Sequence, residues 1–270
     1  MKNSSQGAGL AAGAGALWGT AGLAQALAPA SPAPAAIGAV RMLIGGIGLF
    51  AVLAACGVFA RPVRWLARDI AVAGIGLAGL QFGLFSALPR TGVAVGTMVT
   101  IGSAPVVAGL LGRLFFGEAL TKRWAAATAM ALTGCAAIGL TRAGGEADLG
   151  GIALALFGGA SYALCGVGVK AMAAGTSPLA NLAAMIVLAG TILAVGGAGA
   201  AGGVGAAGGA GGIGGYRWLG TAPGLVFGLY LGLVTCLVPY CLFAWALKRV
   251  AMGKTYTFGL TEPLVAFLFG

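Results

Sequence analysis

Residues 87–124 read ALPRTGVAVGTMVTIGSAPVVAGLLGRLFFGEALTKRW, and this stretch decides the fold. Its apolar run is long enough to cross a bilayer as one helix. Pro105 lies near the middle of that helix. A polar stripe runs through the apolar sequence at helical spacing. The stripe consists of Thr97, Thr100 and Ser103.

Residues 246–270, ALKRVAMGKTYTFGLTEPLVAFLFG, repeat the same pattern near the other end of the chain. Pro263 echoes Pro105 about 158 residues later, and ALKRV echoes ALPRT. Thr257 and Thr261 form a shorter counterpart of the polar stripe. A helix–proline–helix pattern that occurs twice predicts a protein built from two similar halves.

The composition predicts an all-α polytopic membrane protein. Of the 270 residues, 60% are hydrophobic and 7% charged, and the mean hydropathy is +1.02. A soluble domain carries roughly 25% charged residues. The net charge of +10 would suggest a nucleic-acid partner in a soluble protein. Here the basic residues lie in short loops between apolar runs, which is typical of membrane proteins, so we expect a lipid bilayer and no nucleic acid as partner.

The residue types needed for metal or acid–base chemistry are scarce. Histidine is absent, which removes the commonest proton shuttle and metal ligand. No cysteine pair forms a CxxC motif, and we interpret the cysteines as packing residues. We therefore expect no enzyme, no metal and no cofactor. The cysteines are Cys56, Cys135, Cys165, Cys236 and Cys241.

Nine apolar runs are predicted to span the membrane, the first being retained rather than cleaved as a signal peptide. A Gly- and Ala-rich stretch, 196–215, is predicted as a frayed helix end plus a loop. The runs lie near 8–28, 35–59, 70–88, 93–116, 124–141, 150–171, 178–198, 221–246 and 251–270.

Loop charges predict a cytoplasmic N-terminus. With this orientation three basic residues, Arg90, Arg142 and Arg217, fall in the outer loops. Basic residues concentrate in cytoplasmic loops, so the imbalance sets the orientation. The inner loops carry Lys2, Arg61, Arg64, Arg68, Lys122, Arg123, Lys170, Lys248, Arg249 and Lys254.

The two halves are predicted as inverted repeats. Trp18 aligns with Tyr162 and Pro34 with Pro178, both at an offset of 144. An odd number of spans separates the halves, so they enter the membrane from opposite sides. This organisation is typical of secondary transporters whose site lies near the midplane. The halves are 1–148, with five spans, and 149–270, with four, which predicts that a tenth span beyond Gly270 is missing from this sequence.

Several phrases together resemble one family. They are ALWGT at 16–20, AVRMLIGG at 39–46, SAP at 103–105, FFGEALTKRW at 115–124 and LTEPLVAF at 260–267. The chain resembles the drug/metabolite transporter superfamily, specifically the ten-helix EamA-type exporters built from two five-helix halves. The resemblance implies export of small metabolites, amino acids or drugs across a bacterial inner membrane by alternating access. Amino-acid exporters, including those for aromatic amino acids, are the most similar. Tyr162 departs from the pattern, because Trp is common there.

Glu262 is the one carboxylate within a predicted span, about 15 Å along it from Met252. A charge at that depth is costly, so it should face a cavity or a partner. It is interpreted either as a contact for a substrate amine or a proton, or as a group that braces the helix break. The resemblance favours the bracing role, because the Glu-Pro pair is shared by exporters of unlike substrates.

Pro105 and Pro263 each remove a backbone hydrogen bond, from the carbonyls of Ile101 and Gly259. Each is interpreted either as a hinge for rocking or as a static kink. The threonine and serine stripes either face the pathway between the halves or bond back to their own helices.

Further candidates for the pathway are aromatic and amide side chains. Each aromatic residue either contacts substrate or packs in the core. Each amide in hydrocarbon needs a partner, from a neighbouring helix or from the pathway. The candidates are Trp18 and Gln25 in the first run, Gln81 in the third, Tyr162 in the sixth and Tyr240 in the eighth.

Two charges near the ends of spans have simpler interpretations. Arg41 either extends outward to the interface or neutralises an anionic group in an outer vestibule. Glu118 and Lys122 are spaced i,i+4, which predicts a structural ion pair at a cytoplasmic turn.

The leading hypothesis is a monomeric secondary transporter that exports amino acids or related metabolites. A multidrug or nucleotide-sugar transporter is the alternative, but a nucleotide needs several basic residues at mid-depth, and only Arg41 and Arg113 come near. A structural or receptor-like membrane protein is the alternative of another class. Coupling to protons would require Glu262 or another carboxylate, whereas a facilitator requires none.

Overall fold

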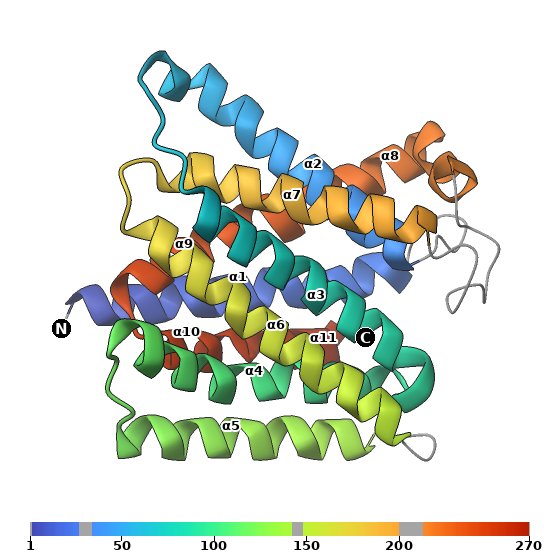
Figure 1. The fold of residues 1–270 in the computed structure, drawn as a ribbon. Coiled ribbons are helices and arrows are strands. Elements are labelled where there is room, and N and C mark those ends of the chain that lie inside the picture. Colours follow the sequence, from blue (N-terminus) through green and yellow to red (C-terminus); the bar gives the residue numbers. More distant parts are fainter. Residues whose placement is uncertain (1, 27–33, 142–147, 200–212, 270) are drawn as a thin grey trace.

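The structure is a computed structural model that describes residues 2–26, 34–141, 148–199 and 213–269 (Figure 1). These residues form helices and connecting turns, and no strand is present among them. All nine predicted runs are helical where they are described. The helices are α1 (Lys2–Ala26), α2 (Pro34–Ala55), α3 (Ala67–Thr91), α4 (Val93–Phe116), α5 (Lys122–Thr141), α6 (Leu149–Ala173), α7 (Pro178–Gly199), α8 (Ala222–Leu229), α9 (Val238–Arg249), α10 (Met252–Gly259) and α11 (Thr261–Phe269), with shorter 3₁₀ turns η1 (Val58–Ala60) and η3 (Ile213–Gly220) and a π-helical segment η4 (Tyr230–Leu237) that joins α8 to α9.

Successive helices run back and forth between two ends of the molecule (Figure 1). The N-terminus and the turns α2–α3, α4–α5, α6–α7 and α9–α10 gather at the left in Figure 1. We name this the basic end. Helices α1 and α6, which begin the two halves, run in opposite directions, as an inverted repeat requires. The described basic residues at this end are Arg61, Arg64, Arg68, Lys122, Arg123, Lys170, Lys248, Arg249 and Lys254.

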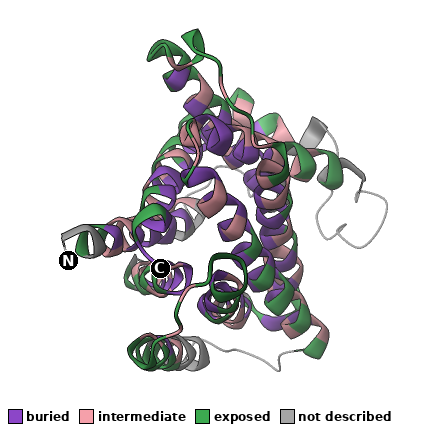
Figure 2. Cartoon of the chain, turned by 60° about the vertical axis from the view of Figure 1, so that its left-hand side comes forward, coloured by how far each residue is buried: buried purple, intermediate pink, exposed green. Residues whose placement is uncertain are grey.

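The outer surface of the helices is apolar. Figure 2 shows buried residues on the inner faces and exposed ones on the outside, where α5 stands at the edge. Exposed side chains include Leu114 at 74%, Met130 at 76% and Leu149 at 81%. A water-facing protein would aggregate through such surfaces, whereas lipid accommodates them. Among the described residues six helices are long and apolar enough to cross a membrane, so the chain is a multi-pass membrane protein.

The turn between α3 and α4 is tighter than the sequence predicted. Helix α3 continues through Pro89 to Thr91, beyond the expected end near residue 88. Gly92 alone joins it to α4, with φ of 76°. A side chain at this φ would be strained, so glycine is what makes a one-residue turn possible here.

The two proline patterns, alike in sequence, fold differently. Helix α4 runs without interruption past Pro105. The second copy breaks: α10 ends at Gly259, and α11 begins at Thr261, two residues before Pro263. The Leu260 amide turns back to the Thr257 carbonyl at 3.3 Å, which closes the first helix. The predicted last span is therefore two short helices.

Glycines join the halves along a seam formed by α3 and α6, which pack together more extensively than any other pair. A Cβ at Gly76 would lie 2.6 Å from the Cys165 amide nitrogen. A Cβ at Gly83 would lie 2.6 Å from the Gly158 Cα. Since real Cβ atoms do not come so close to backbone, these positions require glycine. The seam holds a helix of residues 1–148 directly against one of residues 149–270.

The loop between α2 and α3 is pinned by a buried amide. Asn181, on α7, is fully buried. Its Oδ1 accepts a hydrogen bond from the Leu66 amide at 2.9 Å, and its Nδ2 donates to the carbonyls of Arg64 at 3.1 Å and Ser177 at 2.9 Å. The Asn181 side chain thereby satisfies the Leu66 amide and the Arg64 carbonyl, which no helix or strand serves.

Candidate functional site

Three predicted aromatic residues meet in the middle of the bundle. Trp18 of α1 packs edge-on against Tyr240 of α9, with ring centroids 5.3 Å apart, and against Tyr162 of α6 at 6.1 Å. All three side chains are buried. Trp18 lies about 12 Å along α1 from its Ala26 end, near mid-depth. Residues from both halves therefore share one aromatic centre.

Two further rings, which the sequence analysis missed, extend this centre toward the basic end. Phe243 lies 5.5 Å from Trp18, and Tyr256 of α10 lies 4.7 Å from Tyr162. The Tyr256 hydroxyl donates a hydrogen bond to the Tyr162 carbonyl at 2.6 Å. The signal for Tyr256 was a hydroxyl-bearing ring inside a predicted span, whereas Phe243 resembles any core residue. We call Trp18, Tyr162, Tyr240, Phe243 and Tyr256 the aromatic cluster.

Opposite charges lie beside the aromatic cluster without forming an ion pair. Glu262 of α11 interacts electrostatically with Arg41 of α2 and also with Tyr162 and Tyr240. Among the described residues the ion pairs formed are Arg90–Asp148 and Lys170–Glu118, so Glu262 and Arg41 are near each other but not in contact. A carboxylate and a guanidinium separated in this way can each receive a complementary group.

Arg41 turns inward instead of extending outward to the interface, while its other interpretation, neutralising an anionic group, stays a prediction. Its Nη2 donates a hydrogen bond to the Thr235 carbonyl at 2.5 Å. The residue four positions on from Thr235 is Pro239, which has no N–H to offer that carbonyl. The guanidinium replaces the missing donor. Pro239 was the sequence signal for this contact.

Several buried polar atoms have no hydrogen-bond partner in the part of the chain that the structure describes. They are Trp18 Nε1, Arg41 Nε and Thr100 Oγ1. The Gln81 side chain is buried too and makes no hydrogen bond to a described residue; its Nε2 would lie 3.7 Å from a Cβ at Gly38, one turn from Arg41. A buried polar atom without a partner typically costs about 1–3 kcal/mol. These groups are available to a ligand.

The polar stripes are mostly satisfied by backbone. Ser103 donates to the Thr100 carbonyl at 3.1 Å, and Thr261 donates to the Ala12 carbonyl at 2.8 Å. Thr257 shares a hydrogen bond with Thr128 of α5 at 2.9 Å. Thr97 is half-buried without such a bond. Ser103, Thr257 and Thr261 thus stabilise helix contacts, whereas the Thr100 hydroxyl has no partner among the described residues.

Four predicted residues remain: Pro105, Pro263, Gln25 and Arg113. Pro105 and Pro263 are buried in α4 and α11. Gln25 belongs to α1, but its side chain lies outside the described residues. Arg113 is exposed on the last turn of α4. It therefore adds no second basic group to the centre.

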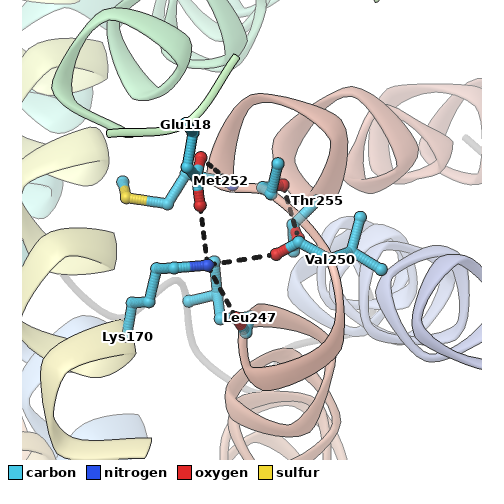
Figure 3. A network of polar contacts seen from close by, with 7 residues as sticks. Glu118, Lys170, Leu247, Val250, Met252 and Thr255 are labelled. Carbon is cyan, nitrogen blue, oxygen red and sulfur yellow. Dashed lines mark hydrogen bonds and ion pairs between the residues drawn. The ribbon is translucent and has the colours of Figure 1, made fainter. Parts of the chain in front are cut away.

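Glu118 does not pair with Lys122, contrary to the prediction. Gly117, with φ of 64°, ends α4, and α5 starts only at Lys122, so the two residues never share a helix. Glu118 instead pairs with Lys170 at the end of α6, with Oε1 2.7 Å from Nζ (Figure 3). The i,i+4 rule holds only within a continuous helix.

Comparison with known proteins shows the family of the chain. A model of the EamA-like transporter family matches residues 5–140. The chain belongs to this family. An uncharacterized transporter of Bacillus subtilis (strain 168), YwfM, is 34% identical over 263 residues, which are 94% of this chain and 80% of that protein. A solved crystal structure with 21% identity superposes with a TM-score of 0.76, covering 98% of this chain and 86% of the other, which shows likeness of fold.

In this EamA-like transporter, aromatic and polar side chains from residues 1–148 and from residues 149–270 meet at the aromatic cluster. Trp18, Arg41 and Gln81 come from the first half, and Tyr162, Tyr240 and Glu262 from the second. The aromatic cluster extends toward the basic end through Phe243 and Tyr256. Arg41 is about 10 Å along α2 from its Pro34 end.

Proposed function

We propose that this EamA-like transporter exports small zwitterions, amino acids with apolar or aromatic side chains, by alternating access. The observation that carries the proposal is the separation of Arg41 from Glu262 beside the aromatic cluster. The guanidinium would receive the carboxylate of the substrate, and Glu262 its ammonium group. Charge-assisted hydrogen bonds of this kind are roughly twice as strong as neutral ones.

The unpaired atoms would give the substrate its orientation. The Trp18 indole N–H has no partner among the described residues and would offer a donor to the substrate carboxylate. Tyr162 and Tyr240 offer ring faces and edges to an apolar or aromatic side chain. A substrate that hydrogen-bonds to these buried polar atoms removes the cost of leaving them unsatisfied, which makes the binding free energy more favourable.

The basic end would face the cytoplasm of a bacterial cell, with the transporter in the inner membrane. This orientation follows from the basic turns gathered there, because such residues are retained on the cytoplasmic side. The aromatic cluster lies between the charged groups and that end. In this conformation the site would be closed toward the cytoplasm, and transport would require an opposite conformation in which it opens.

Transport of nucleotide sugars fits less well. A nucleotide diphosphate carries several negative charges, and Arg41 is the basic residue that the described site offers. The carboxylate of Glu262 would repel a phosphate at close range. Bulky apolar cations could pair with Glu262, but they would leave Arg41 with an uncompensated buried charge.

The test is counterflow of labelled amino acids in proteoliposomes, with a wide set of substrates. Exchange of neutral amino acids, but not of amines or carboxylates that lack the other charge, is the expected result. The variant Trp18→Phe should weaken exchange roughly tenfold, the effect of about 1.4 kcal/mol. Trp218→Phe is the matched control, because Trp218 is buried in a separate cluster with Phe227. Exchange of sugars or bulky cations without amino acids would refute the proposal.

A further inference from the structure

A network of charged and backbone groups lies at the basic end (Figure 3). Lys170 Nζ lies 2.7 Å from Glu118 Oε1. It also donates hydrogen bonds to the carbonyls of Leu247 at 2.9 Å and Val250 at 3.2 Å. Glu118 Oε2 accepts a hydrogen bond from the Met252 amide at 2.7 Å. Both charged side chains are largely buried, at 17% and 12% exposure.

Every donor of the lysine has a partner in this network. An ammonium group has three N–H bonds, and three acceptors surround Nζ. The Met252 amide is the first of α10, one of the groups that a helix leaves without an internal partner. The carboxylate supplies that partner. The contact is therefore a built site rather than a chance approach of two surface charges.

The network ties together parts that belong to different halves. Glu118 lies in the turn between α4 and α5, in the first half. Lys170 lies in the last turn of α6, and Leu247, Val250 and Met252 lie where α9 meets α10, all in the second half. Tyr256 follows one turn after Met252 and belongs to the aromatic cluster. Movement of α10 away from Glu118 would thus open the basic end and carry a ring of the cluster with it.

Two features suit this contact to opening. A carboxylate and an ammonium group regain full hydration when they separate into water, which apolar side chains do not. A small cavity of about 10 Å³, space for one water molecule, adjoins Glu118 and is also lined by Leu120, Trp124, Ala251 and Gly253. Trp124 Nε1 is buried there without a partner. Water can therefore stand beside the ion pair before it breaks.

We infer that Glu118 and Lys170 are the gate pair of this transporter: their contact holds the pathway closed at the basic end, and it breaks in every transport cycle. The inference rests on the alternating access proposed above. The opposing possibility is a permanent staple that never opens. If the pair is a gate, weakening the contact should open the region behind it to reagents from the basic end, whereas a permanent staple would not open. The thiol of Cys165 lies in that region and can report its accessibility.

Cys165 is the reporter. It is buried on α6, behind Lys170 as seen from the basic end, and interacts electrostatically with Tyr162 and Tyr256 of the aromatic cluster. Cys56 is exposed near the end of α2, at the basic end, and serves as an internal control for labelling from that side. Mass spectrometry of alkylated peptides separates the two, so no cysteine has to be removed.

The experiment measures alkylation by a membrane-impermeant maleimide in vesicles of each orientation. Glu118→Gln and Lys170→Met should raise the Cys165 rate roughly tenfold from the basic end, a tenfold shift of the open-to-closed ratio. Lys170→Arg should restore a slow rate. Lys122→Gln, which removes an exposed charge of the same turn, should match wild type. The Cys56 rate should stay constant throughout.

The inference fails if both weakened variants keep the wild-type Cys165 rate. It also fails if the rate rises equally from both sides of the membrane, because that would indicate general loosening of a staple. The readout needs no substrate, so it can fail while amino-acid exchange succeeds, and the reverse. Where exchange is measurable, Glu118→Gln should slow it more than Lys122→Gln does.

Discussion

The guanidinium of Arg41 occupies the position that a backbone amide of residue 239 would fill in an unbroken helix. It donates to the Thr235 carbonyl at 2.5 Å across 194 residues of chain. Pro239 has no N–H to offer that carbonyl, and the π-helical η4 ends two residues before it, at Leu237. One proline in the second half thus fixes an arginine of the first half beside the candidate site.

This relationship predicts coupling between the two residues. Arg41→Met should lower the free energy of unfolding by about 1.5–3 kcal/mol, the range for a hydrogen bond to a charged group. In a Pro239→Ala background the new amide serves the Thr235 carbonyl, so the same substitution should cost less. Thermal unfolding in detergent, arranged as a double-mutant cycle, measures the difference. Equal costs in both backgrounds would show that the carbonyl does not need the arginine.

We expect a substitution of Glu262 to lower transport but to leave the stability of the protein nearly unchanged. Its carboxylate forms no ion pair among the described residues. Glu262→Gln should therefore leave the unfolding free energy within about 0.5 kcal/mol of wild type. Exchange of zwitterions should fall at least roughly tenfold, because the amide cannot neutralise an ammonium group.

Asp148→Asn is the control for Glu262, since that exposed carboxylate lies at the start of α6, outside the site. Exchange should be compared across imposed pH gradients as well. A facilitator keeps no dependence on the gradient, whereas a proton-coupled exporter loses its dependence in Glu262→Gln. Unchanged exchange by Glu262→Gln under all conditions would remove Glu262 from the site.

The glycine seam predicts a strong effect of a single methyl group. Gly76→Ala would place a Cβ 2.6 Å from the Cys165 amide nitrogen, so α3 and α6 must move apart. Overpacking of this kind typically costs about 1–3 kcal/mol. Gly134→Ala in α5 meets nothing within 4 Å and is the control. Yield of monodisperse protein and the unfolding temperature would check this, and equal values for the two variants would contradict the packing.

We expect the buried side chain of Asn181 to protect the loop between α2 and α3 from proteases. Asn181→Ala leaves the Leu66 amide and the Arg64 carbonyl without their partners. Trypsin should then cut after Arg64, which is exposed, several times faster. Asn181→Asp, which keeps the acceptor for Leu66, should give an intermediate rate. Cleavage at the wild-type rate in the alanine variant would mean that other contacts hold the loop.

Hydropathy was sufficient to locate the helices, because each apolar run must satisfy its own backbone in lipid. It could not separate two copies of one pattern, since Pro105 lies inside a continuous helix while the chain breaks before Pro263. That difference depends on packing: Gly259 and Thr261 lie against α1, where a Cβ at Gly15 would meet both.

The candidate site was only partly predictable. Aromatic and charged residues inside spans are conspicuous, and Trp18, Tyr162, Tyr240 and Glu262 do come together. Long-range partners are different. Nothing in the local sequence distinguishes Lys170 from Lys122 as the partner of Glu118. The partner depends on the direction that the chain takes after Gly117 ends α4.

The seam between α3 and α6 also limits how the molecule can change shape. Backbones that meet through Gly76, Gly83 and Gly158 leave no room for lipid tails or a film of water between them. Separating the helices there would break the close packing of α3 against α6. Under the proposed alternating access, the molecule should therefore bend around this seam, with the peripheral helices moving while α3 and α6 stay together.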